Sequence, residues 1–368
     1  MRGVAKGETS TTGNPLIQFF CRSGEFLVDI YSGNYLIDDI STGSVSNKVA
    51  STPITIAMKL GTGRYALPTG TTSSWTIGSH RAVITYKLTS TGSTYTQVIP
   101  FEVLTAADWA SGSLYNGYIP TRQLIDDGYA ASTYSVAKMH KHINRISRQL
   151  EGWLHRVFEP RYQTYYLEGL GTNSLLFSEA IIAIDKAEAI EKDATNTVIA
   201  EEYDHSTLNV YNRHLDGLSA YDDRFNPRVV LPSSVWPTGY QTIRVSGVFG
   251  FTDPDYEATA DRVGLGHTPE ELIQVLGILT SRAIADPTMS NPAGATPGAI
   301  QMMKTRDQTV QFGAGSGAVG SSSLTGDPTL DRLLIRFHAP ISLSYADERE
   351  IVTNTREDEG IEGSADWV

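Results

Sequence analysis

The feature that most constrains this chain is a stripe of apolar residues in its middle, spaced alternately three and four residues apart. Its seven members are Val136, Met139, Ile143, Ile146, Leu150, Trp153 and Val157. An α-helix turns once every 3.6 residues, so this spacing places all seven on one face. We therefore predict a packing helix over residues 132–158, ended by Pro160, with a stripe long enough for pairing in a bundle or across subunits.

The rest of this predicted helix is basic. Five cations stand against one acid, Glu151; they are Lys138, Lys141, Arg145, Arg148 and Arg156. Such cations can contact phosphates, pair with acids on a neighbouring subunit, or face solvent. No stacking aromatic residues are interleaved among them, which disfavours direct DNA binding. The sequence leaves open whether Arg145, Arg148 and Arg156 face DNA in a channel or acids on an adjoining subunit.

The N-terminal quarter of the chain follows a different pattern. Between Pro15 and Leu104, short period-two runs alternate with Gly, Ser, Thr and Pro turns. Examples are Ile54, Ile56 and Met58, then Ala82, Ile84, Tyr86 and Leu88, then Val98, Phe101 and Val103. This alternation predicts half-buried strands and favours an immunoglobulin-like sandwich, although the Cys-Trp-Cys pattern of antibody domains is absent.

Beyond residue 104 the pattern predicts an α+β chain. Residues 162–251 return to strand-like runs, and Thr268-Pro269-Glu270-Glu271 predicts a capping box that opens an apolar helix ending before Asp286. We predict five segments from these patterns. They are a flexible arm (1–13), a β-sandwich (14–106), a linker (107–122), a second domain of helices with inserted strands (123–345) and an extended acidic tail (346–368).

The negative charge of the chain is concentrated at its C-terminus. Residues 347–368 hold eight acids against Arg349 and Arg356, which is six of the net twelve negative charges. Such a block stays extended and often orders on a partner. Ile361, Trp367 and Val368 are its candidate anchors, which predicts docking of this tail on a partner protein or on a neighbouring subunit.

The sequence contains no motif that predicts a catalytic, metal or cofactor site. Gly315 to Gly320 satisfies G-x-G-x-x-G, but SSSLTGDP follows where a helix must start. His140 and His142 lie two residues apart, and we predict that they are exposed histidines on a helix. The clusters Asp222-Asp223 and Asp253-Pro254-Asp255 are predicted to be solvated turns. Cys21, the one cysteine, reads as a buried apolar residue. We predict no enzyme activity, no cofactor and no membrane span.

The order of several phrases resembles the bacteriophage head-tail connector, or adaptor, proteins. They are RQLEGWLHRVFEPR, AIIAIDKAEA, WPTGYQTIRVSGVFGFTD with TPEELIQVLGILTSRAIADP, and QMMKTRDQTVQFGAG before LDRLLIRFHAP. The resemblance spans residues 132–340, a little over half of the chain, and implies a helical-bundle adaptor domain with inserted strands. It does not account for the N-terminal sandwich, which is similar to modules that phage structural proteins often carry.

The resemblance implies a structural virion protein of the phage neck, made in the host cytoplasm. Such proteins form a homo-oligomeric ring, usually twelve-fold, that joins the portal protein to tail or neck proteins and lets DNA pass non-specifically through its lumen. Their C-terminal segment reaches the portal in several cases. Two alternatives stay open: a virion surface or tail module whose sandwich recognises a host glycan or another virion protein, and a nucleotide-dependent enzyme at residues 315–320.

Overall fold

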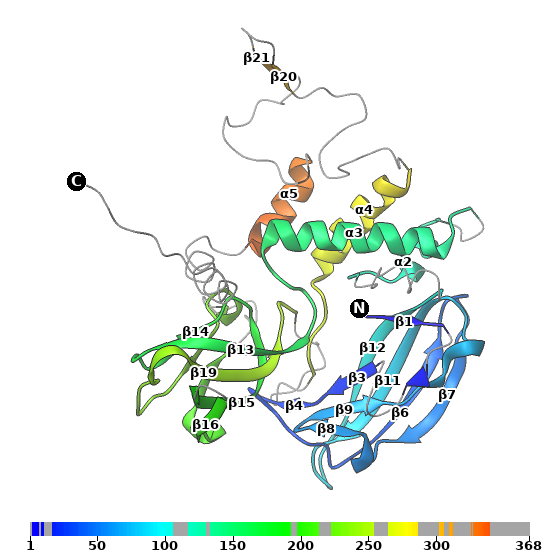
Figure 1. Cartoon of the computed structure of the whole chain (residues 1–368). Helices are drawn as coiled ribbons and strands as arrows, with labels where there is room; N and C mark the ends of the chain where they lie inside the picture. The colour runs from blue at the N-terminus through cyan, green and yellow to red at the C-terminus, as the bar shows by residue number, and fades with distance from the viewer. Residues whose placement is uncertain are drawn as a thin grey trace. The chain divides into compact units, whose positions relative to one another are not determined.

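The computed structural model shows a β-rich α+β chain with several sheets and few helices (Figure 1). It describes residues 2–6, 9–10, 17–105, 117–129, 133–192, 197–212, 222–253, 264–285, 302–304, 309–311, 325 and 327–338. The chain divides into two compact units. Unit 1 comprises Met1–Pro160 and Thr252–His338, and unit 2 comprises Arg161–Phe251 and Ala339–Val368. The predicted α+β class is confirmed, while the predicted domain boundaries stay a prediction.

The N-terminal part of unit 1, here called the two-sheet region (residues 2–105), contains a five-stranded and a three-stranded sheet. The first has the order β1-β12-β11-β6-β7, with β1 Arg2–Ala5, β12 Thr94–Leu104, β11 Gly78–Lys87, β6 Ser32–Asp39 and β7 Ser46–Pro53. The second has the order β3-β9-β8, with β3 Ile17–Phe20, β9 Arg64–Leu67 and β8 Lys59–Gly61. Two short pairs accompany them: β2 Thr9–Ser10 with β10 Gly70–Thr71, and β4 Arg22–Ser23 with β5 Phe26–Leu27.

Side chains from both sheets form one core. Phe19 on β3, Leu67 on β9, and Ile37 and Ile84 on β6 and β11 are each fully buried in the same cluster. The predicted alternation of Ala82, Ile84 and Tyr86 is confirmed, because all three point into this core. Cys21 is buried in the same cluster, as predicted for an apolar residue.

The two-sheet region departs from the sequence prediction at two places. Arg2–Ala5 form strand β1, paired in parallel with β12 and anchored by the fully buried Val4, instead of a flexible arm. Ile56 lies in the short 3-10 helix Ile56–Met58 and is 81% exposed, instead of alternating inward on a strand. Pairing with a strand about one hundred residues later places Val4 in the core, and local periodicity does not encode such pairing.

The described helices of unit 1 are α2 Thr121–Asp126, α3 Val136–Leu154, α4 Glu270–Ala285 and α5 Pro328–Leu334, the last continuing into the 3-10 helix Ile335–Phe337. Helix α3 packs against α4, α4 packs against α5, and α2 contacts both long helices as well as β11 (Figure 1). Met139, Ile143, Ile146 and Leu150 of the predicted stripe are fully buried. Among the described residues, no helix combines the length and apolar character that crossing a membrane requires.

The ends of these helices differ from the prediction. Helix α3 begins after Ser135, whose side chain accepts a hydrogen bond from Lys138 N, and it ends at Leu154 instead of Pro160. His155 stops it by adopting a left-handed conformation with φ of 52°. Before α4 the hydroxyl of Thr268 donates to the carbonyl oxygen of Phe158 at 2.9 Å, so it connects the segment that precedes α4 to the segment that follows α3. The predicted capping box stays a prediction.

Unit 2 is built from strands. Its main sheet contains β13 Arg161–Leu170, β19 Thr238–Phe249, β15 Ile181–Lys192 and β16 Thr197–Glu202, each antiparallel to the next. A smaller sheet has the order β14-β18-β17, with β14 Ser174–Leu176, β18 Arg228–Val230 and β17 Asn209–Tyr211. Two 3-10 turns, His205–Thr207 and Asp223–Phe225, interrupt the strands. The remaining described strands, β20 Met302–Lys304 and β21 Thr309–Gln311, form a hairpin in unit 1.

Candidate functional site

A buried carboxylate, Glu102 on β12, connects the two-sheet region to helices α2 and α3 within unit 1. Its side chain is fully buried, and each of its two oxygens has two hydrogen-bond partners. Oε1 accepts from Ser79 Oγ at 2.6 Å and from Thr121 N at 2.9 Å. Oε2 accepts from Thr121 Oγ1 and lies 2.9 Å from His140 Nε2. Four polar groups from three elements therefore converge on one carboxylate.

The elements hold these groups in place through their own geometry. Ser79 and Glu102 are directly opposite each other on the paired strands β11 and β12. Thr121 is the first residue of α2, where backbone N–H groups lack helical partners and are therefore free to donate to a carboxylate. Arg122 N donates to Ser79 Oγ at 3.0 Å, so the start of α2 contacts both members of the strand pair.

A second buried pair lies beside this cluster on the same sheet. His80 is fully buried, and its Nε2 lies 3.8 Å from Asp39 Oδ2. Burial lowers the pKa of His80. Burial alone would raise the pKa of Asp39, but hydrogen bonds from the side chain and backbone of Ser41 outweigh it and lower that pKa to about 2. Asp39 therefore stays ionised, and it also pairs with Lys48 Nζ at 3.3 Å.

The arrangement around Glu102 suits a structural connection between elements. Nucleophilic catalysis needs a hydroxyl whose proton a histidine can take, but the Ser79 hydroxyl donates its hydrogen bond to Glu102. Ser79, Glu102 and Thr121 are each at most 1% exposed, so a substrate does not reach them. We therefore describe Glu102, Ser79, Thr121 and His140 as the Glu102 clamp, which fixes α2 and α3 to the two-sheet region.

The sequence prediction missed the Glu102 clamp. His140 and His142 were predicted to be exposed, yet they are 5% and 7% exposed. The burial of His140 follows from what packs on α3, since Glu102 lies beside that side of the helix and contacts the imidazole ring. A glutamate in the apolar strand sequence FEVL was the available signal, because a charged residue buried in a strand needs partners. Asp222, predicted to be solvated, instead pairs with Arg224 within unit 2.

Two of the three arginines predicted as channel or inter-subunit cations are engaged within their own chain. Arg148 pairs with Glu151 through Nη1, and its guanidinium lies 6.0 Å from the ring centre of Tyr118. Burial and the nearby Glu151, which accepts a hydrogen bond from the Tyr118 hydroxyl, raise the pKa of Tyr118. Arg156 is only 5% exposed, which leaves little of its surface for DNA or a neighbouring subunit. Their predicted roles stay predictions.

Arg145 differs from these two. It is half-buried, and its Nε and Nη2 atoms are buried without a hydrogen-bond partner in the part of the chain that the structure describes. His142, one turn before it, and Gln149, one turn after it, likewise carry buried atoms without such a partner, Nδ1 and Oε1. Burial, and then the positive charge of Arg145, lower the pKa of His142. These three residues form a polar face of α3 that the described residues leave unsatisfied.

The other predicted site residues fall outside the described residues. These are Ile361, Trp367 and Val368 of the acidic tail, and the glycine-rich run of residues 315–320. Within the described ranges, no group of three or more His, Cys, Asp or Glu side chains is placed to hold a metal ion. Docking of the tail stays a prediction.

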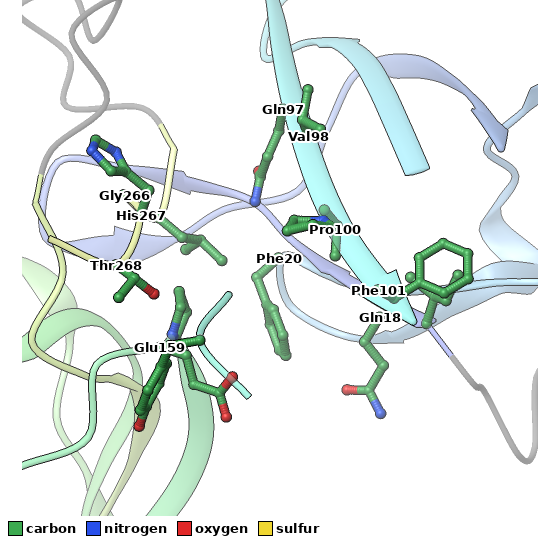
Figure 2. A pocket seen from close by; sticks show the side chains of 15 residues that line it. Gln18, Phe20, Gln97, Val98, Pro100, Phe101, Glu159, Gly266, His267 and Thr268 are labelled. Carbon is green, nitrogen blue, oxygen red and sulfur yellow. The ribbon is translucent and has the colours of Figure 1, made fainter. Parts of the chain in front are cut away.

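Unit 1 also has a pocket of about 190 Å³ on the β12 side of the two-sheet region. Figure 2 shows Gln97, Val98 and Pro100 on one side, with Glu159, His267 and Thr268 facing them across Phe20. Val98 is 51% exposed, although it lies on a strand. Its side chain lies on the outer face of that strand, where every second residue from Thr94 to Pro100 is exposed. The pocket is mainly apolar with a few polar side chains, as small binding pockets usually are.

Comparison with known proteins gives no family. No protein-family model matches the chain, and no curated protein matches it. Among solved structures, the chain is similar to one described as "Neck of empty GTA particle computed with C6 symmetry". That similarity has a TM-score of 0.33 at 11% sequence identity, and it covers 61% of this chain and 90% of the other. At this level a common fold is not established.

Proposed function

We propose that the chain is a structural protein of a phage neck. It forms a homo-oligomeric ring, twelve-fold as in the proteins its sequence resembles, that joins the portal protein to the tail and continues the DNA channel. Its function is assembly and channel continuity, without catalysis, a cofactor or a membrane. Its location is the head-tail neck of the virion.

The packing of α3, α4 and α5 supports this proposal most directly. The sequence phrases that resemble adaptor proteins are scattered over two hundred residues, and the helices among them lie in separate parts of the chain. In the structure these helices pack together in unit 1, while the strands between them form unit 2. This arrangement agrees with a helical bundle interrupted by inserted strands, which is the architecture that the resemblance implies.

The topology of the two-sheet region supports an immunoglobulin-like sandwich. In that fold strands G, F and C, extended by C′, form one sheet and B, E and D form the other. Numbered along the chain, β12-β11-β6-β7 corresponds to G-F-C-C′ and β3-β9-β8 corresponds to B-E-D. The parallel strand β1 extends the first sheet beside β12. The Glu102 clamp fixes this module to the helices, as suits a protein that must keep its shape within a particle.

Imaging of the full chain assembled with its portal protein tests the proposal. A discrete ring coaxial with the portal is expected, and a dispersed location over the capsid or tail surface would contradict it. Deletion of residues 346–368 is expected to leave the body folded and to abolish assembly with the portal. Unchanged co-assembly of the deleted variant would remove Ile361, Trp367 and Val368 from the docking contact.

A binding module on the virion surface is the second candidate, and the pocket beside Val98 favours it. An apolar pocket with several polar side chains beside β12 suits a glycan or a peptide. A glycan array probed with the full chain tests this reading. A neck protein is expected to bind no glycan, whereas selective binding that Val98→Arg abolishes would favour the surface module.

A further inference from the structure

One face of α3 carries positive charge and polar atoms that the described residues leave unsatisfied. We call it the α3 flank, and it comprises Lys138, Lys141, His142, Arg145 and Gln149. At 100° per residue these five lie on one side of the helix, next to the buried stripe. Glu151, the acid of this helix, lies on another side and pairs with Arg148. The flank is therefore positively charged without an acid of its own helix beside it.

The unsatisfied atoms define what a ligand must offer. Arg145 contributes buried N–H donors at Nε and Nη2, whereas Gln149 contributes a buried acceptor at Oε1. His142 is more than nine-tenths buried, and its Nδ1 lacks a partner among the described residues. Leaving such groups unpaired is costly, so they indicate a missing partner. That partner must accept from a guanidinium and donate to an amide oxygen.

An acidic peptide meets both requirements. A side-chain carboxylate accepts two parallel hydrogen bonds from an arginine, and a peptide backbone N–H donates to an amide oxygen. The phosphodiester backbone of DNA offers acceptors to Arg145 but no N–H for Gln149.

The chain itself contains a suitable peptide. Residues 347–368 carry eight acids and two arginines and lie beyond His338, the last described residue. We propose that this acidic tail of one copy docks on the α3 flank of a neighbouring copy, with carboxylates on Arg145, Lys138 and Lys141. The inference rests on the proposed ring, because a head-to-tail contact between different surfaces of successive copies is what closes a ring.

Carbodiimide cross-linking tests this docking directly in the full chain. The reagent joins a lysine amine to a carboxylate in contact with it, so Lys138 and Lys141 report on nearby acids. Copies labelled with nitrogen-14 and nitrogen-15 are mixed before assembly, and cross-linked peptides are identified by mass spectrometry. We expect cross-links from Lys138 or Lys141 to acids of residues 347–368 that join peptides of different isotope.

Two variants and one control make the test specific. Arg145→Glu is expected to reduce these cross-links about tenfold, because it replaces the central donor by a like charge. Arg332→Glu reverses an exposed charge on a different helix, α5, and is expected to leave them unchanged. Arg145→Gln removes the charge with a milder change of side chain and leaves every reacting lysine and tail carboxylate in place. It is expected to reduce the cross-links as well, so the test holds even if Arg145→Glu fails to fold.

Each contrary outcome has a separate meaning. Absent cross-links, or cross-links unaffected by Arg145→Glu, would overturn the docking. Cross-links only within single copies would overturn its assignment to a neighbour. If the cross-links are absent and duplex DNA binds in a way that depends on Arg145, the ligand of the α3 flank is the DNA backbone and not the acidic peptide. If the chain forms a coaxial ring at the portal but these cross-links are absent, only the docking proposal fails. If the cross-links are present but the chain is not located at the portal, only the proposed neck function fails.

Discussion

His140 Nε2 lies 2.9 Å from Glu102 Oε2, and the two residues are 38 positions apart in the chain. One belongs to helix α3 and the other to strand β12, so this contact joins two kinds of structure within unit 1. Ser79 and Thr121 complete the cluster around the same carboxylate. A buried carboxylate is tolerated only when donors surround it, which makes the clamp a point where stability is concentrated.

We predict that Glu102→Ala destabilises the protein by about 3 kcal/mol, because it leaves the donors of Ser79, Thr121 and His140 buried without an acceptor. Urea unfolding followed by tryptophan fluorescence measures the change. The matched control is Glu168→Ala, on the exposed side of β13. It is expected to change the free energy of unfolding by less than about 0.5 kcal/mol. Equal effects of the two substitutions would show that the Glu102 clamp contributes no more to the free energy of unfolding than an exposed glutamate does.

The ionised state of Asp39 predicts a dependence of stability on pH. Its pKa of about 2 lies below the ordinary value of 3.8, so its contribution is complete above pH 3.8 and is lost as the pH falls towards 2. The contribution is on the order of 2 kcal/mol. Asp39→Asn should therefore reduce stability near pH 6 and have little effect near pH 2, as measured by denaturant unfolding across this range.

The control for this pH dependence is Asp127→Asn. Asp127 is exposed at the end of α2, and its replacement is expected to preserve the wild-type pH profile. An Asp39→Asn variant that differs from wild type equally at pH 2 and pH 6 would contradict the prediction.

Local periodicity predicted the elements whose pattern is self-contained. The alternation of Ala82, Ile84 and Tyr86 gave β11, and the stripe from Met139 to Leu150 gave α3 with its buried face. These predictions succeeded because a helix forms its backbone hydrogen bonds within itself and each element presents one apolar face. Both properties depend on residues that are close in the sequence.

Long-range contacts decided the features that the sequence prediction missed. Val4 is buried because β1 pairs with β12 about one hundred residues later in the chain, and no nearby pattern marks that pairing. His140 was predicted to be exposed because a histidine on a helix gives no indication that Glu102 lies beside it.

The end of α3 was placed at Pro160, but the left-handed conformation of His155 ends the helix earlier. Such a conformation is uncommon for a residue other than glycine.

Two glycines with nearly equal backbone angles predict different costs of substitution. Gly63 and Gly24 have φ of 61° and 60°, where only glycine is free of strain. A Cβ at Gly63 would lie 2.5 Å from Cys21 O and 2.8 Å from Val28 O, whereas a Cβ at Gly24 meets no atom within 4 Å. Gly24→Ala is expected to cost about 1 kcal/mol. Gly63→Ala is expected to cost at least about 3 kcal/mol, because rigid backbone must move.

Thermal or urea unfolding of both glycine variants measures this difference. The comparison isolates the close backbone approach, because the strain of the left-handed conformation is common to both positions. Equal losses of stability would show that the segment around Cys21 and Val28 moves aside freely.

The thiol of Cys21 is predicted to be unreactive in the folded protein. Its side chain is fully buried, and burial raises its pKa to about 12, so almost no thiolate forms near pH 8. Labelling by a disulfide reagent is therefore expected to be slower than in guanidinium-unfolded protein by roughly a thousandfold. Cys21 is the single cysteine of the chain, so the absorbance signal reports on it alone. Labelling of one thiol per folded chain at the unfolded rate would mean that the two-sheet core opens to the reagent. Labelling that speeds up in Glu102→Ala would link the clamp to that opening.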